Sequence, residues 1–141
     1  MCIRTKKTPV ERFMNTSEKL SYQVIGCIIE VYKTLGPGLL EIVYEKALIH
    51  ELELKGISVA SQVEVHVNYK GVDVCNGLRL DLLVNDTIII ELKSVEEIKA
   101  VHYKQLLSYL RLTNKQVGLL VNFNVDDIMG GIKRVVNNYI P

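Results

Sequence analysis

Apolar residues near the start of the chain recur at steps of three and four, the period of an amphipathic helix. The first such stripe predicts a helix over residues 17–34, with Thr16 or Ser17 as its N-cap. The Gly-Pro-Gly sequence at residues 36–38 is expected to end it. A second stripe predicts a helix over residues 39–55. Its expected buried residues are Leu40, Val43, Tyr44, Ala47, Leu48 and Leu52.

The middle of the chain changes to a period of two, which predicts half-buried strands. Residues 63–69 alternate Val or Tyr with polar residues, and Gly71 marks a turn after them. Residues 78–84 and 88–93 are two further apolar runs. We expect these runs to pair as a hairpin, because the Asn-Asp-Thr sequence at residues 85–87 is typical of a turn.

The last third predicts one more helix and one or two strands. Ser94 followed by Glu97 fits a capping box, so a helix is expected to run from there to about Leu112. Residues 117–121 are apolar and predict a buried strand, whereas residues 132–136 fit either a strand or a helix. This order of elements predicts an α/β domain with a mixed sheet flanked by helices.

Composition narrows the class of protein. With 141 residues, 48% hydrophobic and 23% charged, the chain has the size and balance of one globular domain. A net charge of +1 gives no bulk argument for nucleic-acid binding. The three cysteines are far apart, which excludes a CxxC metal site and favours reduced thiols in a cytoplasmic protein. No apolar run approaches the ~20 residues of a membrane span.

The start of the chain differs from the rest. Residues 1–15 are expected to form a basic N-terminal tail, with disorder as one alternative, and Met14 is a second candidate for the first residue. The domain is then expected over residues 16–141.

The hydrophobic pattern also selects the register of the hairpin. A three-residue loop at residues 85–87 keeps one face apolar, whereas a two-residue loop would place Leu80 opposite Glu91. Such a slip is strongly penalised when one face is buried. The expected pairs are Val84 with Ile88, Leu82 with Ile90 and Leu80 with Leu92 on one face, and Leu83 with Ile89, Asp81 with Glu91 and Arg79 with Lys93 on the other.

This register sets two carboxylates opposite each other. Directly opposed residues have Cβ atoms roughly 4.5–5.5 Å apart, and like charges there repel. A divalent cation between Asp81 and Glu91 would remove the repulsion, and hard oxygen ligands suit Mg²⁺ or Mn²⁺. Lys93 lies on the same face, where it can stabilise developing charge or hold an attacking water. The alternative is a surface salt-bridge ladder with Arg79, although the run of Ile at residues 88–90 favours a buried setting.

Further positions could support such a centre. Gln105 and Tyr109, with His102, fall within about 60° of one another on the predicted helix and could touch a phosphate or a water. The alternative is a solvated helix face. Glu41 could be a third acidic group near the metal or a simple complement to the helix dipole. Basic residues that could neutralise phosphates, or merely solubilise the protein, are Lys99, Lys104, Arg111, Lys115, Lys133 and Arg134.

Several of these segments together resemble a known family. The motif Gly38-x-x-Glu41-x-x-Tyr44 resembles the signature of the GxxExxY proteins, small prokaryotic proteins of the PD-(D/E)xK nuclease superfamily. The resemblance extends over roughly residues 16–139. The other blocks that carry it are residues 77–81, 90–94, 102–110 and 118–123.

The resemblance implies a restriction-endonuclease-like αβββαβ core with a mixed central sheet. It also implies that Asp81 and Glu91 bind metal, that Lys93 assists hydrolysis and that Glu41 matches an acidic helix position. Gln105 and Tyr109 resemble a QxxxY motif of the exonuclease branch. The chain departs from the nominal signature at Leu80, where proline is expected, and it lacks the clustered cysteines of the iron–sulfur members.

The sequence thus predicts a nuclease that depends on Mg²⁺ or Mn²⁺ and acts on DNA or, less favoured, RNA. Asp81, Glu91, Glu41 and the Leu92 carbonyl are the expected metal ligands, and Lys93, Gln105 and Tyr109 complete the expected catalytic set. The alternative is a module that keeps the fold but only binds nucleic acid or protein. A homodimer is a further alternative, because one small domain covers little of a duplex.

Overall fold

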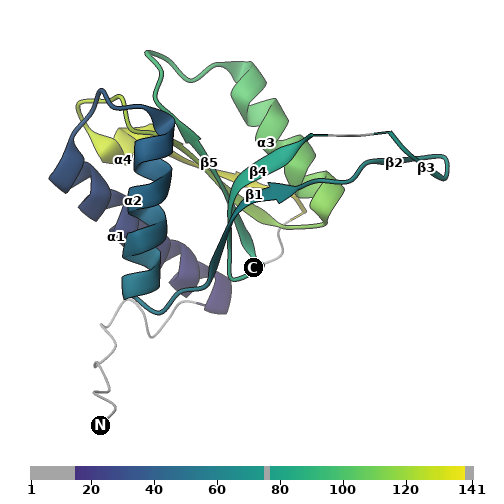
Figure 1. Cartoon of the computed structure of the whole chain (residues 1–141), viewed down its shortest axis with the longest axis horizontal. Coiled ribbons are helices and arrows are strands. Elements are labelled where there is room, and N and C mark those ends of the chain that lie inside the picture. The colour runs from purple at the N-terminus through teal and green to yellow at the C-terminus, as the bar shows by residue number, and fades with distance from the viewer. Residues whose placement is uncertain (1–14, 75–76, 139–141) are drawn as a thin grey trace, which may run out of the picture.

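A five-stranded sheet with helices on both faces forms the body of the protein (Figure 1). The computed structural model describes residues 15–74 and 77–138, so most of the expected N-terminal tail lies outside the described residues. Helices α1 (Thr16–Leu35) and α2 (Glu41–Leu54) cover one face of the sheet, and α3 (Ala100–Thr113) covers the other. The predicted α/β architecture with a mixed sheet is confirmed.

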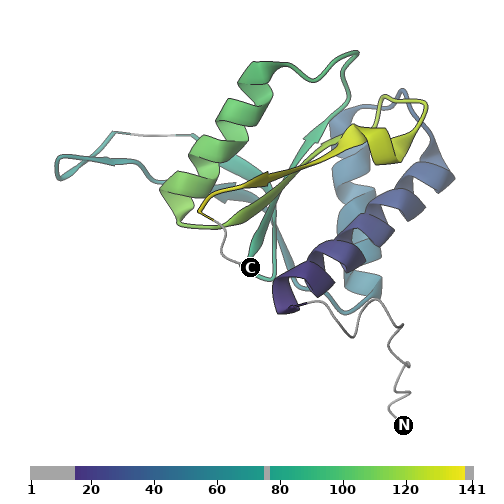
Figure 2. The same ribbon diagram turned by 180° about the vertical axis from the view of Figure 1, so that it is seen from behind.

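The sheet order is β1-β4-β5-β6-β7, in which only the β5–β6 pair is parallel. Its strands are β1 (Val59–Glu64), β4 (Arg79–Val84), β5 (Ile88–Lys93), β6 (Val117–Asn122) and β7 (Ile132–Val136). Strand β7 forms one edge of the sheet, and the short helix α4 (Ile128–Gly131) precedes it beside α1 (Figure 2). A small hairpin of β2 (Asn68–Tyr69) and β3 (Val72–Asp73) projects away from the sheet (Figure 1).

The sheet separates two hydrophobic clusters, because alternate side chains of a strand point to opposite faces. The α1/α2 cluster takes from the sheet Leu82, Val84, Ile88, Ile90, Leu92, Val117, Leu119 and Val121. The α3 cluster contains Val65, Leu80, Ile89, Leu106, Tyr109, Leu110 and Leu120. Strand β5 supplies side chains to both, as expected for a run of Ile covered on both faces. Within residues 15–74 and 77–138, no helix combines the length and apolar character that crossing a membrane requires.

Two helix starts differ from prediction. Helix α1 is capped by Asn15 and not by Thr16 or Ser17, because Asn15 Oδ1 and Glu18 accept each other's backbone N–H at 2.8 and 2.9 Å. The predicted capping box at Ser94 is also wrong, since α3 begins at Ala100. The Ser94 hydroxyl instead donates to the Leu39 carbonyl at 2.6 Å.

The remaining differences concern strand limits and burial. The strand predicted at residues 63–69 begins earlier, at Val59, and β1 ends at Glu64. Leu40 and Val43 are exposed, because α2 packs through the four-residue step of Tyr44, Leu48 and Leu52. Residues 132–136, which fitted either structure, form a strand against β6.

Candidate active site

Asp81 and Glu91 meet where β4 and β5 part. The hydrogen-bonded register ends with Leu82 opposite Ile90, as the three-residue loop predicted. Beyond it, the Leu92 N–H donates to Asp81 Oδ2 at 2.9 Å, and the Asp81 N–H donates to Glu91 Oε1 at 3.3 Å. Each carboxylate therefore accepts a hydrogen bond from a backbone N–H of the other strand. In a continuous ladder, backbone carbonyls would accept these bonds. The expected juxtaposition of the two acidic side chains is present.

Strand β4 turns over at Asp81, which the hydrophobic pattern did not predict. Leu82 packs in the α1/α2 cluster, whereas Leu80 packs in the α3 cluster. Residues two apart share a face in a regular strand. The expectation that Leu80 lies on the same face as Leu92 is therefore wrong. The change of face leaves the Asp81 carboxylate between the strands, within reach of the Leu92 N–H.

The Glu91 carboxyl group is buried, with 6% of the residue exposed. Burial raises the pKa of Glu91 from 4.5 to about 8, because a charged carboxylate loses its hydration there. The negative charge of Asp81 and a hydrogen bond between the two side chains act in the same direction, while the Asp81 N–H bonded to Glu91 and the positive charge of Lys93 act against them. The Asp81–Glu91 pair is thus a place where two negative charges are unfavourable, so Glu91 keeps its proton at neutral pH.

Lys93 and Leu92 continue the strand beside this pair. Lys93 is half-buried and lies two residues after Glu91, so both side chains leave β5 on the α3 side, as Ile89 does. The Leu92 side chain points the other way, into the α1/α2 cluster. Its N–H faces β4, and its carbonyl faces the same way, since the two groups of one strand residue share a side.

Glu41 reaches the end of β5 from the start of α2. Its Oε1 accepts the Ser94 N–H at 3.3 Å, one residue beyond Lys93. The preceding loop is fixed by Tyr44, whose hydroxyl donates to the Gly36 carbonyl at 2.6 Å and accepts the Leu39 N–H at 3.1 Å. The Gly38-x-x-Glu41-x-x-Tyr44 motif therefore acts locally: it folds the loop that brings Glu41 to the strand end.

Gln105 and Tyr109 lie together on α3, as predicted. Gln105 Nε2 donates to the Tyr109 hydroxyl at 3.0 Å, while Tyr109 itself is buried in the α3 cluster. Tyr109 is thus a core residue with a polar tip rather than part of an exposed polar edge. His102 has a local role, since its Nδ1 accepts the Lys99 N–H at 2.9 Å and caps the helix. Among the described residues, no three His, Cys, Asp or Glu side chains form a group that could hold a metal ion.

A comparison with known protein families shows which superfamily the chain belongs to. A sequence model of the PD-(D/E)XK nuclease superfamily matches residues 18–135. The chain belongs to this superfamily. Members of the PD-(D/E)XK superfamily are generally nucleases and typically use divalent metals. The narrower resemblance to GxxExxY proteins stays a prediction, and neither a curated protein nor a solved structure matches the chain.

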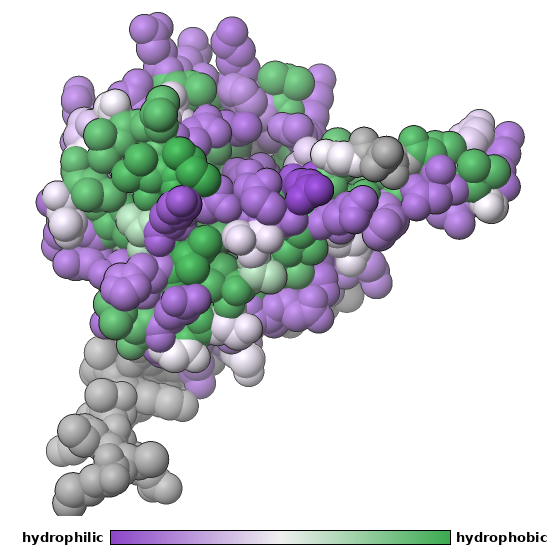
Figure 3. Space-filling model, viewed as in Figure 1, coloured by the Kyte–Doolittle hydropathy of each residue, from purple (hydrophilic) through white to green (hydrophobic). Residues whose placement is uncertain are grey.

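The exposed surface near the start of α2 is uneven. Exposed apolar side chains gather about the start of α2, and a hydrophilic zone separates them from the projecting hairpin (Figure 3). Among the basic residues considered, Lys115 is paired with Asp86 at 3.0 Å in the β4–β5 turn. Lys115 is therefore turned away from the acidic pair.

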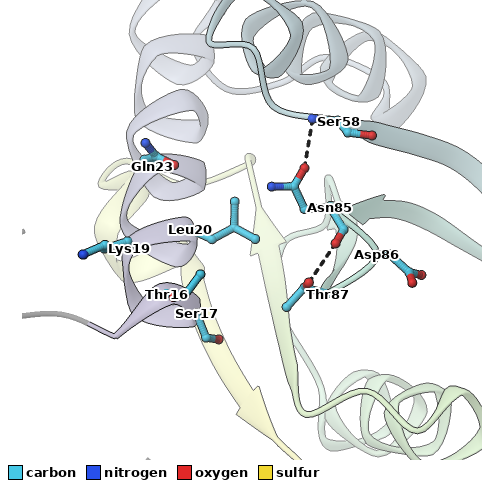
Figure 4. Close-up of a pocket in the computed structure, with 9 residues that line it drawn as sticks. All are labelled: Thr16, Ser17, Lys19, Leu20, Gln23, Ser58, Asn85, Asp86 and Thr87. Atoms are coloured by element: carbon cyan, nitrogen blue, oxygen red, sulfur yellow. Dashed lines mark hydrogen bonds between the residues drawn. The ribbon is translucent and has the colours of Figure 1, made fainter. Parts of the chain in front are cut away.

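A pocket of about 820 Å³ lies at that same turn and not at the acidic pair (Figure 4). It is bounded by the start of α1 and by the β4–β5 turn, where Asn85 Oδ1 accepts the Ser58 N–H at 3.1 Å. None of the predicted site residues lines it. Its side chains are Thr16, Ser17, Lys19, Leu20, Gln23, Ser58, Asn85, Asp86 and Thr87.

Two polar residues near the acidic pair were missed by sequence reasoning. Glu45 is 8% exposed, and both of its carboxylate oxygens accept hydrogen bonds from Gln62 Nε2 at 3.2 Å. Gln62 lies in β1 at the position beside Asp81. The available signal was Glu45 itself, an acidic residue one turn after Glu41 and next to the buried Tyr44.

Proposed function

We propose that the protein is a metal-dependent phosphodiester hydrolase that acts on nucleic acid. The observation that carries the proposal is the Asp81–Glu91 pair: two acidic side chains from adjacent strands, one of them buried, with Lys93 two residues further along β5. A pair of this kind is unfavourable when both groups are charged, unless a cation is shared between them. Membership of the PD-(D/E)XK superfamily supports the same reading.

The residues present fit a Mg²⁺ or Mn²⁺ ion. Such ions prefer hard oxygen ligands and keep part of their water shell, so two carboxylates and one carbonyl are a suitable protein contribution. Asp81, Glu91 and the Leu92 carbonyl would hold the ion, with Glu41 as a further acidic group at the end of β5, where it accepts the Ser94 N–H. When bound, the ion supplies Lewis-acid activation of the phosphate and lowers the pKa of a water molecule.

The protein's own side chains would do the rest. Lys93 would neutralise charge developing on the phosphate or orient the attacking water. Gln105 would contact a phosphate from α3, and Tyr109 would fix the Gln105 amide through their hydrogen bond of 3.0 Å. Glu41 would hold the loop after β5 through the Ser94 N–H.

The proposed substrate is DNA in preference to RNA. The proposed location of the protein is the cytoplasm. A homodimer would let two such centres act on both strands of a duplex. Affinity for either nucleic acid should come mainly from basic residues that contact phosphates, and should fall with salt.

The test combines metal binding with cleavage. The purified chain is titrated with Mn²⁺ by calorimetry, and then incubated with supercoiled DNA, linear DNA and RNA in Mg²⁺, Mn²⁺ or chelator. We expect metal-stimulated cleavage that is absent in Asp81→Asn. A wild-type chain that binds nucleic acid but neither binds Mn²⁺ at millimolar concentration nor cuts would instead be a binding module, and the proposal would be wrong.

A further inference from the structure

The strands that carry the acidic pair are distorted along one row of residues. In the β1–β4 ladder, Ser61 pairs with Leu82 and Val63 pairs with Leu80, but Gln62 and Asp81 between them are not paired. The next strand in the same row contributes Glu91, beyond the last β4–β5 pair. The row Gln62–Asp81–Glu91 is thus where regular pairing is lost on both sides of β4.

The side chains of β1 change from one face of the sheet to the other at this row, as those of β4 do. Val59 packs against the α1/α2 cluster, whereas Val63 packs against the α3 cluster, although residues four apart share a face in a regular strand. The turn-over occurs at Gln62, whose φ of 51° lies in the left-handed region that L-residues other than Asn and Asp seldom adopt. A backbone of this kind persists only where the surroundings hold it.

Glu45 is the group that holds it. The Gln62 amide donates to both oxygens of the Glu45 carboxylate at 3.2 Å, and the residue Glu45 is 8% exposed on the packed side of α2. A hydrogen bond to a buried carboxylate is stronger than one between neutral groups. It therefore fastens the strained residue of β1 to a helix that is itself anchored in the core through Tyr44 and Leu48.

We propose that Glu45 and Gln62 are positioning residues for the acidic pair. Their hydrogen bonds hold the change of face in β1, and this change allows β4 to place the Asp81 carboxylate between the strands. The chain of contacts runs from α2 through Gln62 to the unpaired position of Asp81, and from Asp81 Oδ2 to the Leu92 N–H at 2.9 Å. Neither Glu45 nor Gln62 touches the reacting atoms. The inference rests on the proposed function for its catalytic meaning, but its geometric content can be tested without activity.

The test uses three variants and one control. Gln62→Met keeps a side chain of similar length and the strained backbone but removes the amide, Glu45→Ala removes the acceptor, and Glu45→Gln keeps an oxygen that can accept the bond. Glu53→Ala, an exposed change on the same helix, is the control. Amide hydrogen exchange is measured by NMR at Leu92, whose N–H is bonded to Asp81, and at Ile90, which pairs with Leu82 in the regular ladder.

We expect faster exchange at Leu92 but not at Ile90 in Gln62→Met and Glu45→Ala, with near wild-type exchange in Glu45→Gln and Glu53→Ala. Mn²⁺ binding should weaken about ten-fold or more in the first two variants, the usual effect of losing a residue that orients metal ligands. Unchanged exchange at Leu92 in Gln62→Met would overturn the inference. A wild-type chain that binds no Mn²⁺ would overturn the proposed function instead, while the exchange measurement would still decide the positioning role.

Discussion

The backbone N–H of Leu92 is bonded to the side chain of Asp81, at 2.9 Å from Oδ2, and not to a carbonyl of β4. A residue proposed for metal binding thus also satisfies a backbone donor in the middle of the sheet. Leu92 is buried, so no water could accept a hydrogen bond from this N–H if the carboxylate were removed. The link between Asp81 and Leu92 makes the proposed chemistry and the stability of the sheet depend on the same side chain.

Two substitutions of Asp81 should separate these effects. Asp81→Asn keeps an oxygen that can accept the Leu92 N–H, whereas Asp81→Ala leaves that buried donor unsatisfied, at a cost of about 1–3 kcal/mol. We expect both variants to lose Mn²⁺ binding and cleavage, but only the Ala variant to lose stability in urea unfolding. Asp126→Asn, at an exposed position outside the sheet, is the control. Equal stability of the Ala and Asn variants would show that the bond to Leu92 contributes nothing.

The raised pKa of Glu91 predicts how stability depends on pH. Between pH 4.5 and about 8 the folded protein keeps a proton on Glu91 that the unfolded chain has released. The free energy of unfolding should therefore fall as pH rises through this window, by up to about 1.4 kcal/mol per pH unit. Urea unfolding at several pH values measures this slope, and Glu91→Gln should flatten it. A slope that Glu91→Gln leaves unchanged belongs to another group.

Divalent metal should reverse this trend. A cation competes with the proton on Glu91, so Mn²⁺ affinity should increase with pH up to about 8. At millimolar Mn²⁺ the loss of stability toward pH 8 should shrink. Thermal unfolding with and without Mn²⁺ at pH 6 and pH 8 checks the prediction; the same increase in melting temperature at both values would contradict it.

Lys93 should matter for cleavage and not for metal binding. Lys93→Met keeps the aliphatic stem of this half-buried side chain but removes its charge. We expect cleavage to fall roughly 100-fold or more, as when a group that stabilises developing charge is lost, while Mn²⁺ still binds. Lys46→Met, an exposed change on α2, is the control. Full cleavage by Lys93→Met would exclude a catalytic role for this residue.

Adjacent glycines in α4 offer a matched test of packing. A Cβ atom at Gly131 would clash with the backbone oxygen of Asn122 and lie 3.0 Å from the Val125 side chain, whereas one at Gly130 would meet nothing within 4 Å. Backbone cannot move aside as a flexible side chain can, so we expect Gly131→Ala to lose about 1–3 kcal/mol. Gly130→Ala should stay near wild type. Chemical denaturation of the two variants decides; equal stabilities would contradict this packing.

Tyr44 should stabilise the loop before α2 through its hydroxyl group. Tyr44→Phe keeps the ring stacked on Phe123, with centroids 4.2 Å apart, but loses the bonds to Gly36 and Leu39. We expect a loss of about 1–2 kcal/mol, and faster amide exchange at Leu39. Tyr22→Phe, at a tyrosine that is 48% exposed, should leave the free energy of unfolding unchanged. If both variants unfold alike, the Tyr44 hydroxyl does not hold the loop.

Local patterns predicted the parts of this fold that obey a regular period. The β4–β5 register followed from keeping Leu82 and Ile90 on a buried face, and the three-residue turn between the strands followed from it. Periodicity failed where the backbone departs from regular geometry. The change of face at Asp81 depends on Gln62, a residue from a strand 19 positions earlier, and no stripe in the sequence reports such a contact.

The other errors have the same origin. Ser94 looked like a helix cap, but its hydroxyl is used by the Leu39 carbonyl, a partner 55 positions away. Tyr109 looked like part of a polar edge, but the ring fills the α3 cluster and only its hydroxyl is available to Gln105. In each case a long-range contact decided between two conformations or burials that the local sequence allows equally.

The crossed hydrogen bonds of the acidic pair affect how an inactive form of this protein should be made. Workers who want a catalytically dead chain that still captures its substrate usually begin with alanine. Here Asp81→Ala would remove both the charge and a hydrogen bond between two central strands. A weakened sheet could then be mistaken for a loss of affinity for substrate. The Asp81→Asn variant keeps an oxygen that can accept this hydrogen bond, so any substrate that it binds can be attributed to the native surface.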